Sequence, residues 1–406
     1  MIASDWMYRR QGPHSKMRRQ IIAEQLEAVL RNSLEAPGLR LVSLDGERPS
    51  VDAKREPWIE IKYGPASPDD WFGIVPATAQ FERSAGKGRE SLNLIVKVNP
   101  RPGLARNLIP WIIENKSIRL DRPYWDYHNA AETDRTTDRE FHVYELAATG
   151  SSALSRVLPR YYGAASDPAT GERALFMEQL TDISRLDAAG AQADWPIEAI
   201  GAAFAAAAAW QAEFWGADNV SLSWAGPRVT TEDMLADEPL WRGLLDDAHA
   251  RFPGVITEEV KRRRHRLIDT MDVWHRAKDA LPGTLAHNDF NNRNVGFRPG
   301  VVVLDWELAE CNTAHRDLVE MLAFVVPSAA TRSDIDRLLE RHRTMLAEMG
   351  VKAGLDRDTW MEAFRCELKV EAINRISMQC IFEAAFPLAY FERINANIER
   401  LLDLYS

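Results

Sequence analysis

The sequence predicts an α+β protein with two lobes, a small lobe built on an antiparallel sheet and a larger helical lobe after it. Three observations lead to this fold class. Short apolar runs separated by Gly, Pro and Asp clusters fill residues 39–100, a pattern typical of strands joined by tight turns. After residue 180, nearly every periodic segment has helical spacing. The chain has 406 residues, enough for two or three compact units.

We expect a helical extension over residues 1–38, a sheet lobe over 39–178 and a helical lobe over 179–406. Apolar residues recur at helical spacing over Lys16–Glu35, which predicts a helix there. The sheet lobe should contain four apolar strands, with a long polar connection over Pro100–Arg135 and a helix over Asp138–Thr149 before the last one. These strands are Trp58–Tyr63, Gly73–Phe81, Leu92–Val98 and Ala174–Leu180.

The second lobe should be helical apart from one interruption at Thr284–Leu308, which contains an Asn-rich loop and the β-branched run Val301–Leu304. The expected helices are Pro196–Trp215, Thr231–Arg251, Thr257–Ala280, Ala329–Met349 and Thr359–Leu402.

Composition excludes several classes of protein. Hydrophobic residues make up 46% of the chain, which supports a globular core rather than disorder. The net charge of −10 argues against nucleic acid as the main partner, because phosphate backbones attract basic surfaces. Three widely spaced cysteines form neither a disulfide framework nor a zinc motif. With no signal-peptide or bilayer-length apolar segment, we expect a cytoplasmic protein without membrane contact; the oligomeric state stays open.

The most informative segment lies between Leu285 and Glu307. His287, Asp289 and Asn294 form the pattern H-x-D-x-x-x-x-N, and Asp305 follows eleven residues later at the end of an apolar run. An Asp/Asn-rich turn before a buried strand would explain part of this pattern. The whole combination, however, resembles the catalytic and metal-binding segments of protein-kinase-like phosphotransferases, and most closely the aminoglycoside phosphotransferase and choline kinase family with its ecdysteroid-kinase-like relatives.

Two departures from the protein-kinase pattern favour a small-molecule kinase. Asn288 stands where protein kinases have the Arg of H-R-D, and Trp306-Glu307 stands where they have Phe-Gly. No activation segment with an A-P-E-like element follows Asp305. The resemblance therefore implies a bilobal protein-kinase-like fold that acts on a small molecule.

The resemblance implies a role for each residue of this segment. Asp289 is the catalytic carboxylate that meets the acceptor hydroxyl, and Asn294 and Asp305 are the Mg²⁺ ligands. His287 is expected to brace the loop rather than act as a base. Either Glu307 and Glu310 line the acceptor site, or Glu307 helps to hold the metal and Glu310 is solvated.

The sheet lobe should supply the nucleotide site. Lys97 lies within an apolar strand and resembles the lysine that binds the α- and β-phosphates, although an edge-strand lysine facing solvent is the plainer interpretation. Its expected helical partner is Glu140, with Glu145 as the alternative. We expect Gly64–Gly73 to cover the phosphates. The resemblance also implies a hinge that contacts the adenine ring, formed by Met177, Glu178, Gln179 and Leu180.

The function implied is transfer of a phosphoryl group from ATP, or another nucleoside triphosphate, to a hydroxyl of a small molecule. The carboxylates after Asp305 and the net charge favour an aminoglycoside, a choline-like compound or another amino-bearing alcohol. A catalytically inactive nucleotide-binding or scaffold protein and a transferase of a different group remain alternatives. The partners are thus a nucleotide with Mg²⁺ and a small alcohol.

Overall fold

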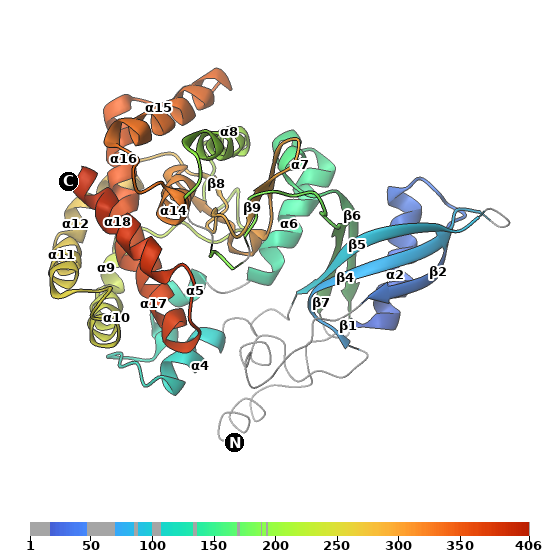
Figure 1. Ribbon diagram of the computed structural model, residues 1–406, viewed down its shortest axis with the longest axis horizontal. Helices are drawn as coiled ribbons and strands as arrows, with labels where there is room; N and C mark the ends of the chain where they lie inside the picture. The colour runs from blue at the N-terminus through green and yellow to red at the C-terminus, as the bar shows by residue number, and fades with distance from the viewer. Residues whose placement is uncertain are drawn as a thin grey trace. The chain divides into compact units, whose positions relative to one another are not determined.

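The protein forms two compact units in a computed structural model that describes residues 17–46, 70–84, 88–99, 107–132, 136–168, 171–187, 189–191 and 194–405 (Figure 1). The first unit comprises Met1–Leu108 and Pro159–Thr181, and the second comprises Ile109–Leu158 and Asp182–Ser406. The first unit carries the main sheet and the second is mostly helical, so the predicted α+β class is confirmed.

A five-stranded antiparallel sheet is the centre of the first unit, with the strand order β2-β4-β5-β7-β6. Its strands are β2 (Arg40–Gly46), β4 (Gly73–Glu82), β5 (Glu90–Asn99), β6 (Tyr161–Asp167) and β7 (Glu172–Glu178). The short strands β1 (Met17–Arg18) and β3 (Asp70–Trp71) pair separately. Helix α2 (Arg19–Ser33) follows β1 directly and lies against the sheet (Figure 1).

The two faces of this sheet differ in character. Leu94, Val96 and Val98 of β5 point into the core that α2 completes through Ile22 and Leu26. Because side chains alternate along a strand, Lys97 points to the opposite face. Its register partners Ile74 and Leu175 share that face, and the side chain of Ile74 is 57% exposed. The second face thus carries a lysine flanked by apolar side chains.

Most predicted elements of this unit are found, and four strands that were not predicted are added: β1, β2, β3 and β6. The runs predicted around residues 73–81, 92–98 and 174–180 correspond to β4, β5 and β7, and the N-terminal helix corresponds to α2. Strands β2 and β6 were not predicted individually. The predicted strand at residues 58–63 and residues 64–69 of the proposed phosphate loop lie outside the described residues, and the rest of that loop contains β3 and the start of β4.

Helices dominate the second unit, and the predicted helical segments are confirmed with finer divisions. The prediction of a polar connection over residues 100–135 is wrong in part, because the described portion contains the helices α4, η2 and α5. Helix α4 buries Ile109 and Ile112. The helices up to residue 279 are α4 (Leu108–Asn115), η2 (Tyr124–Asp126), α5 (Asn129–Glu132), α6 (Thr136–Thr149), α7 (Ser152–Val157), α8 (Ile197–Glu213), α9 (Thr231–Ala236), α10 (Glu238–Arg251), α11 (Glu258–Asp269), α12 (Met271–Trp274) and α13 (Arg276–Asp279).

Two small antiparallel strand pairs interrupt the helices of the second unit, as the β-branched run had indicated. β8 (Thr284–Ala286) pairs with β11 (Glu310–Asn312), and β9 (Val295–Phe297) pairs with β10 (Val301–Val303). The helices after them are η3 (Trp306–Leu308), α14 (His315–Val325), α15 (Arg332–Glu348), α16 (Arg357–Val370), the π-helix η4 (Glu371–Arg375), α17 (Ile376–Ala385) and α18 (Phe391–Tyr405). Among the described residues, no helix combines the length and apolar character needed to cross a bilayer.

Candidate active site

The H-x-D-x-x-x-x-N segment forms the loop between β8 and β9 in the second unit. Asn288, beside the predicted catalytic aspartate, has φ 59°, and Asp305, after β10, has φ 60°. Asn and Asp occupy this left-handed region more readily than other side chains because they form local hydrogen bonds there. Backbone conformations of this kind cluster at functional sites. The loop and the end of β10 therefore each turn sharply beside a predicted site residue.

His287 connects these two turns. Its Nε2 lies 2.9 Å from the carbonyl oxygen of Leu304, the residue before Asp305. Its Nδ1 accepts a hydrogen bond from the backbone N–H of Asp289 at 3.2 Å. The ring is fully buried, and burial lowers its pKa. These contacts fit a neutral imidazole that braces the loop, the role expected of His287.

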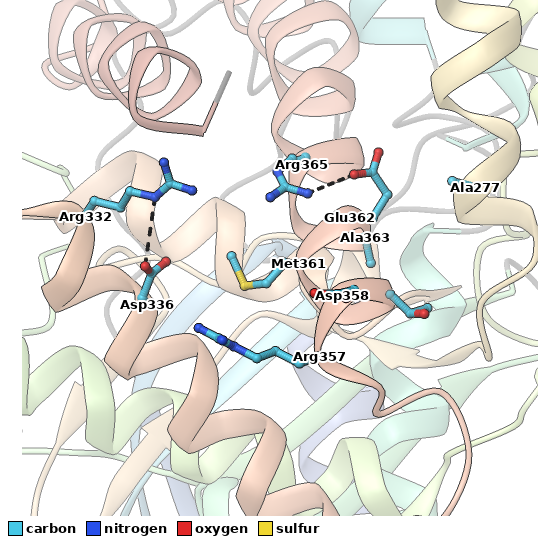
Figure 2. Close-up of a pocket in the computed structure, with 10 residues that line it drawn as sticks. Ala277, Arg332, Asp336, Arg357, Asp358, Met361, Glu362, Ala363 and Arg365 are labelled. Carbon is cyan, nitrogen blue, oxygen red and sulfur yellow. Dashed lines mark hydrogen bonds and ion pairs between the residues drawn. The ribbon is translucent and has the colours of Figure 1, made fainter.

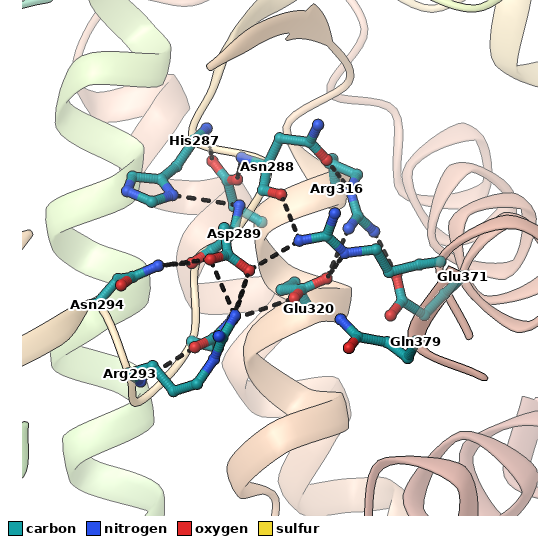
Figure 3. A network of polar contacts seen from close by, with 12 residues as sticks. His287, Asn288, Asp289, Arg293, Asn294, Arg316, Glu320, Glu371 and Gln379 are labelled. Atoms are coloured by element: carbon teal, nitrogen blue, oxygen red, sulfur yellow. Dashed lines mark hydrogen bonds and ion pairs between the residues drawn. The ribbon is translucent and has the colours of Figure 1, made fainter. Parts of the chain in front are cut away.

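Asp289 sits at the centre of a polar network (Figure 3). Its Oδ2 accepts from Asn294 Nδ2 at 2.7 Å, and its Oδ1 accepts from Asn291 Nδ2 at 2.9 Å. Arg293 Nη2 bridges both oxygens at 2.9 and 3.0 Å. Arg375 Nη2 adds a contact to Oδ1 at 2.7 Å. Four donor groups from the loop and from η4 thus fix one carboxylate.

This environment determines the charge of Asp289. Burial by itself would raise the pKa of the carboxyl, but the guanidinium groups of Arg293 and Arg375 outweigh it and hold the pKa below its ordinary value. Asp289 is therefore ionised at neutral pH, the form that accepts hydrogen bonds, and an incoming hydroxyl would have to take the place of one of the four donors.

A second carboxylate, Asp317, holds the backbone of the loop. Its two oxygens accept from the backbone N–H groups of His287 at 3.1 Å and Asn288 at 3.0 Å, and from Gln211 Nε2 at 3.0 Å. These contacts hold the backbone of the two residues that directly precede Asp289, and they come from α14.

Its neighbour Arg316 ties the same loop to two helices. Arg316 Nε donates to Asn288 Oδ1 at 2.7 Å, Nη2 donates to Glu320 at 2.6 Å, and Nη1 donates to Glu371 in η4. The three charged side chains are at most 3% exposed. Sequence reasoning missed this cluster, although the run His315-Arg316-Asp317-Leu318 was a signal that could have indicated it.

Arg375 was also missed. It lies 86 residues from Asp289 in sequence and enters the site from the π-helix η4, which directly continues α16. Besides Asp289 it contacts the carbonyl oxygen of Asn288 at 3.0 Å and Glu320 at 3.5 Å. Short π-turns inside helices occur frequently at functional sites, but no local sequence pattern predicts this one.

Asn294 and Asp305 offer hard oxygen atoms of the kind that Mg²⁺ prefers. Asn294 uses its side-chain N–H₂ group toward Asp289, so its carboxamide oxygen is the atom that could hold a metal. Within the described ranges no group of three or more His, Cys, Asp or Glu side chains could hold a metal by itself. A magnesium ion bound here would depend on substrate phosphates for further ligands, as Mg²⁺ commonly does.

The two glutamates after Asp305 differ in their surroundings. Glu307 lies in η3 and is half-buried, whereas Glu310 lies in β11 and is 4% exposed. Glu310 accepts a hydrogen bond from Asn312 Nδ2 at 2.5 Å, and burial raises its pKa. The alternative in which Glu310 is solvated is therefore wrong, and its interior position favours a structural role over contact with an acceptor.

The predicted nucleotide-binding residues are divided between the units. Lys97 of β5 and Met177 of β7 lie on the same face of the sheet, and Glu178, Gln179 and Leu180 follow at the end of β7, where Glu178 accepts from the backbone N–H of Arg160 at 3.2 Å. Glu140 belongs to the second unit; it is buried in α6, which packs against η3. The pairing of Lys97 with Glu140 stays a prediction.

A pocket of about 660 Å³ lies elsewhere in the second unit, between α15 and α16 (Figure 2). Arg332 and Arg365 contact Asp336 and Glu362 within it, at 3.9 and 2.9 Å. Its three arginines face three carboxylates, and no predicted site residue lines it. The Asp289 network is therefore the better candidate for chemistry.

A sheet unit with a strand lysine, followed by a helical unit with the loop and metal-type ligands above, defines the class of phosphoryl-transfer proteins. A model of the phosphotransferase enzyme family matches residues 80–351, about two thirds of the chain. The chain belongs to this family. The matched residues include both β5, which carries Lys97, and the loop between β8 and β9.

Solved structures with a similar fold include small-molecule kinases. A GDP complex of aminoglycoside 2'-phosphotransferase-IIIa with an F108L substitution has 11% identity and a TM-score of 0.44, with 95% of this chain and 100% of that chain covered. An ethanolamine kinase from Plasmodium vivax has 9% identity and a TM-score of 0.42, with 92% and 85% covered. A microcompartment-associated aminopropanol kinase has 12% identity and a TM-score of 0.42, with 81% and 90% covered. No curated protein matches significantly.

Proposed function

We propose that the protein is a kinase that transfers the γ-phosphoryl group of ATP to a hydroxyl of a small molecule. The observation that carries this proposal is the fixed, ionised carboxylate of Asp289 in a loop that also presents Asn294. The acceptor oxygen would form the new bond to the γ-phosphorus while the bond from that phosphorus to the β-phosphate oxygen breaks. ADP leaves, and Asp289 accepts the hydroxyl proton.

The remaining residues would position the reactants. Lys97 would bind phosphates from the sheet unit, with Glu140 as its partner, and the backbone at Met177–Leu180 would contact the adenine ring. Asn294 and Asp305 would hold Mg²⁺, which neutralises charge on the phosphates. Phosphoryl transfer needs positioning and charge stabilisation more than covalent chemistry, so these roles are sufficient.

The test is ATP consumption against a library of small alcohols, with the variant Asp289→Ala beside the parent. We expect the variant to lose at least about 100-fold in kcat, because the acceptor hydroxyl loses its carboxylate partner. Asp272→Ala, at an exposed aspartate of α12, is the matched control and should keep the parent rate. An Asp289→Ala variant as active as the parent would contradict the proposed role of this residue.

An inactive nucleotide-binding protein remains the second candidate, and one observation favours it: the oxygens of Asp289 are already occupied by four described donors. Both candidates predict that ATP with Mg²⁺ raises the melting temperature, since a ligand that binds only the folded state stabilises it. Only the kinase also consumes ATP when an alcohol is added. Binding without turnover across the library would therefore favour the inactive protein.

A further inference from the structure

We infer that the acceptor alcohol carries an anionic group, a carboxylate or a phosphate ester, that binds to Arg375 and Arg293 beside Asp289. This inference rests on the proposed kinase function and names its substrate class. It departs from the amino-bearing alcohol that the sequence suggested. The side chains of Arg375 and Arg293 are 19% and 24% exposed, so both guanidinium groups are largely desolvated next to the carboxylate.

The two oxygens of Asp289 face different groups. Oδ2 contacts Asn294, the proposed metal ligand, whereas Oδ1 contacts Arg375 from the π-helix η4. The first side is where the nucleotide phosphates and Mg²⁺ are proposed to bind. The second side is left for the acceptor, and the cation there comes from the C-terminal helices. Figure 3 shows Arg293 and the metal ligand Asn294 approaching the same carboxylate.

Aromatic side chains that would suit a cationic acceptor are already in use. The guanidinium carbon of Arg293 lies 5.0 Å from the ring centre of Tyr390 and 5.6 Å from that of Phe324. Cation–π contacts with such faces are a common means of binding choline-like groups. Here a protein cation holds them, so a second positive charge at this point would be repelled.

The donors on Asp289 also explain how an anion would help the reaction. A carboxylate has about four lone-pair sites, and Asn291, Arg293 and Arg375 all use Oδ1. An acceptor hydroxyl has no free place on that oxygen while Arg375 remains bound to it. An anionic group on the acceptor offers Arg375 an alternative partner, and the acceptor hydroxyl can then take the place of Arg375 among the three donors on Oδ1. An alcohol without such a group lacks this means of opening the site.

The experiment compares matched acceptors in the parent, Arg375→Gln and Arg375→Lys. The library contains hydroxycarboxylates and phosphate monoesters, each beside an alcohol of the same skeleton without the anion, for example glycerate and glycerol 3-phosphate beside glycerol, and serine beside serinol. We expect the parent to favour the anionic member by on the order of 100-fold in kcat/KM, as for a desolvated charge pair. Arg375→Gln should lose most of this preference, and Arg375→Lys should retain part of it.

The ratio of kcat/KM between the anionic and the neutral acceptor of each pair shows whether Arg375 binds the acceptor or only positions Asp289. If Arg375 only holds Asp289, or serves the transferred phosphoryl group, Arg375→Gln lowers both members of a pair equally, and the inference is overturned. A parent that favours amino-bearing or neutral alcohols overturns it as well while leaving the kinase proposal intact. Arg357→Gln, at an exposed arginine of α16, is the control and should keep the parent ratio.

Melting temperatures provide a readout that does not depend on turnover. Without nucleotide, members of the anionic set should raise the melting temperature of the parent but not of Arg375→Gln. If no anion in the library shifts the parent, the inference fails even where ATP is consumed. If anions shift the parent but no alcohol consumes ATP, the anion site stands and the kinase proposal fails.

Discussion

The carboxylate of Asp317 holds the backbone of the loop that contains Asp289 through hydrogen bonds. It accepts from two consecutive backbone N–H groups, those of His287 and Asn288, at 3.1 and 3.0 Å. Asn288 has a left-handed backbone conformation, so the loop needs an external restraint at this position. Asp317 supplies that restraint from the rigid, fully buried helix α14. We therefore place it among the positioning residues.

Replacing Asp317 by Asn should destabilise the protein by about 2 kcal/mol, because an amide has one acceptor oxygen and its N–H₂ group would face a backbone donor. Urea unfolding of the parent and the variant measures this difference. Asp272→Asn, at an exposed aspartate, is the control and should change stability by less than about 0.5 kcal/mol. An Asp317→Asn variant as stable as the parent would show that the three contacts contribute little.

Sequence reasoning found the site residues that lie close together in the chain. His287, Asp289 and Asn294 fall within eight residues, and the loop that they form returns on itself so that Asn294 contacts Asp289. Arg375 could not be found in this way, because it lies 86 residues away and only tertiary packing brings it to Oδ1. Arg293 lies inside the motif, but the sequence does not show in which direction the side chain of a single Arg in a loop points.

At the scale of elements, the predicted strand β5 has a clear apolar pattern, and the missed strand β6 does not. β5 contains Leu92–Val98, whereas β6 is Tyr161–Asp167 and is rich in Gly, Ala and Ser. At Gly163 of β6 there is no room for a side chain, because the strand lies close to α2 and a Cβ would lie 2.6 Å from Val29 Cγ1. Gly163 also has φ +145°, which favours glycine. Tertiary contact, not strand propensity, determines this strand.

Helix α8 contains a glycine that, unlike Gly163, has room for a side chain. Gly201 lies within α8 in an ordinary helical conformation, and a Cβ there would meet Leu338 of α15 at 3.4 Å, a normal contact distance. Gly201→Ala should therefore stabilise the protein by roughly 0.5–1 kcal/mol, because Ala loses less entropy in a helix than Gly. A urea unfolding midpoint that falls rather than rises would contradict this expectation.

Gly216, shortly after the end of the same helix, is the matched control. Its φ is +85°, and a Cβ would meet nothing within 4 Å, so only backbone strain opposes a side chain. Gly216→Ala should lower stability by about 1 kcal/mol. Both variants should consume ATP at the parent rate, since neither glycine contacts the Asp289 network.

At the scale of the whole molecule, the buried histidines and the buried carboxyls of the second unit have opposite effects on the free energy of unfolding as the pH changes. Burial lowers the pKa of His315 and of His342 to about 3, and that of His275 to about 4. Burial also raises the pKa of Asp317 and of Glu371 to about 7. The unfolded histidines take up protons at a higher pH than the folded ones, so they favour the unfolded state below pH 6.5. The folded carboxyls take up protons at a higher pH than the unfolded ones, so they favour the folded state as the pH falls from 7 towards 4.

His342 allows one of these contributions to be measured alone. Its ring is buried 5.6 Å from that of Trp360, and its Nε2 lies 2.9 Å from Oε1 of Gln211, the residue that donates to Asp317. The pKa of this histidine is about 6.5 in the unfolded chain and about 3 in the folded protein. It should therefore lower the free energy of unfolding of the parent by about 2 kcal/mol between pH 7 and pH 5. His342→Gln removes the titration while keeping a donor for Gln211.

The free energy of unfolding of the parent should therefore fall by about 2 kcal/mol more than that of His342→Gln between pH 7 and pH 5, in urea titrations at fixed ionic strength. Between pH 7 and pH 8 the difference between the two proteins should stay constant, because both folded and unfolded histidine are then mostly neutral. This second interval is the internal control for any change in packing that the substitution brings. Parallel curves over the lower interval would show that His342 takes up its proton in the folded state.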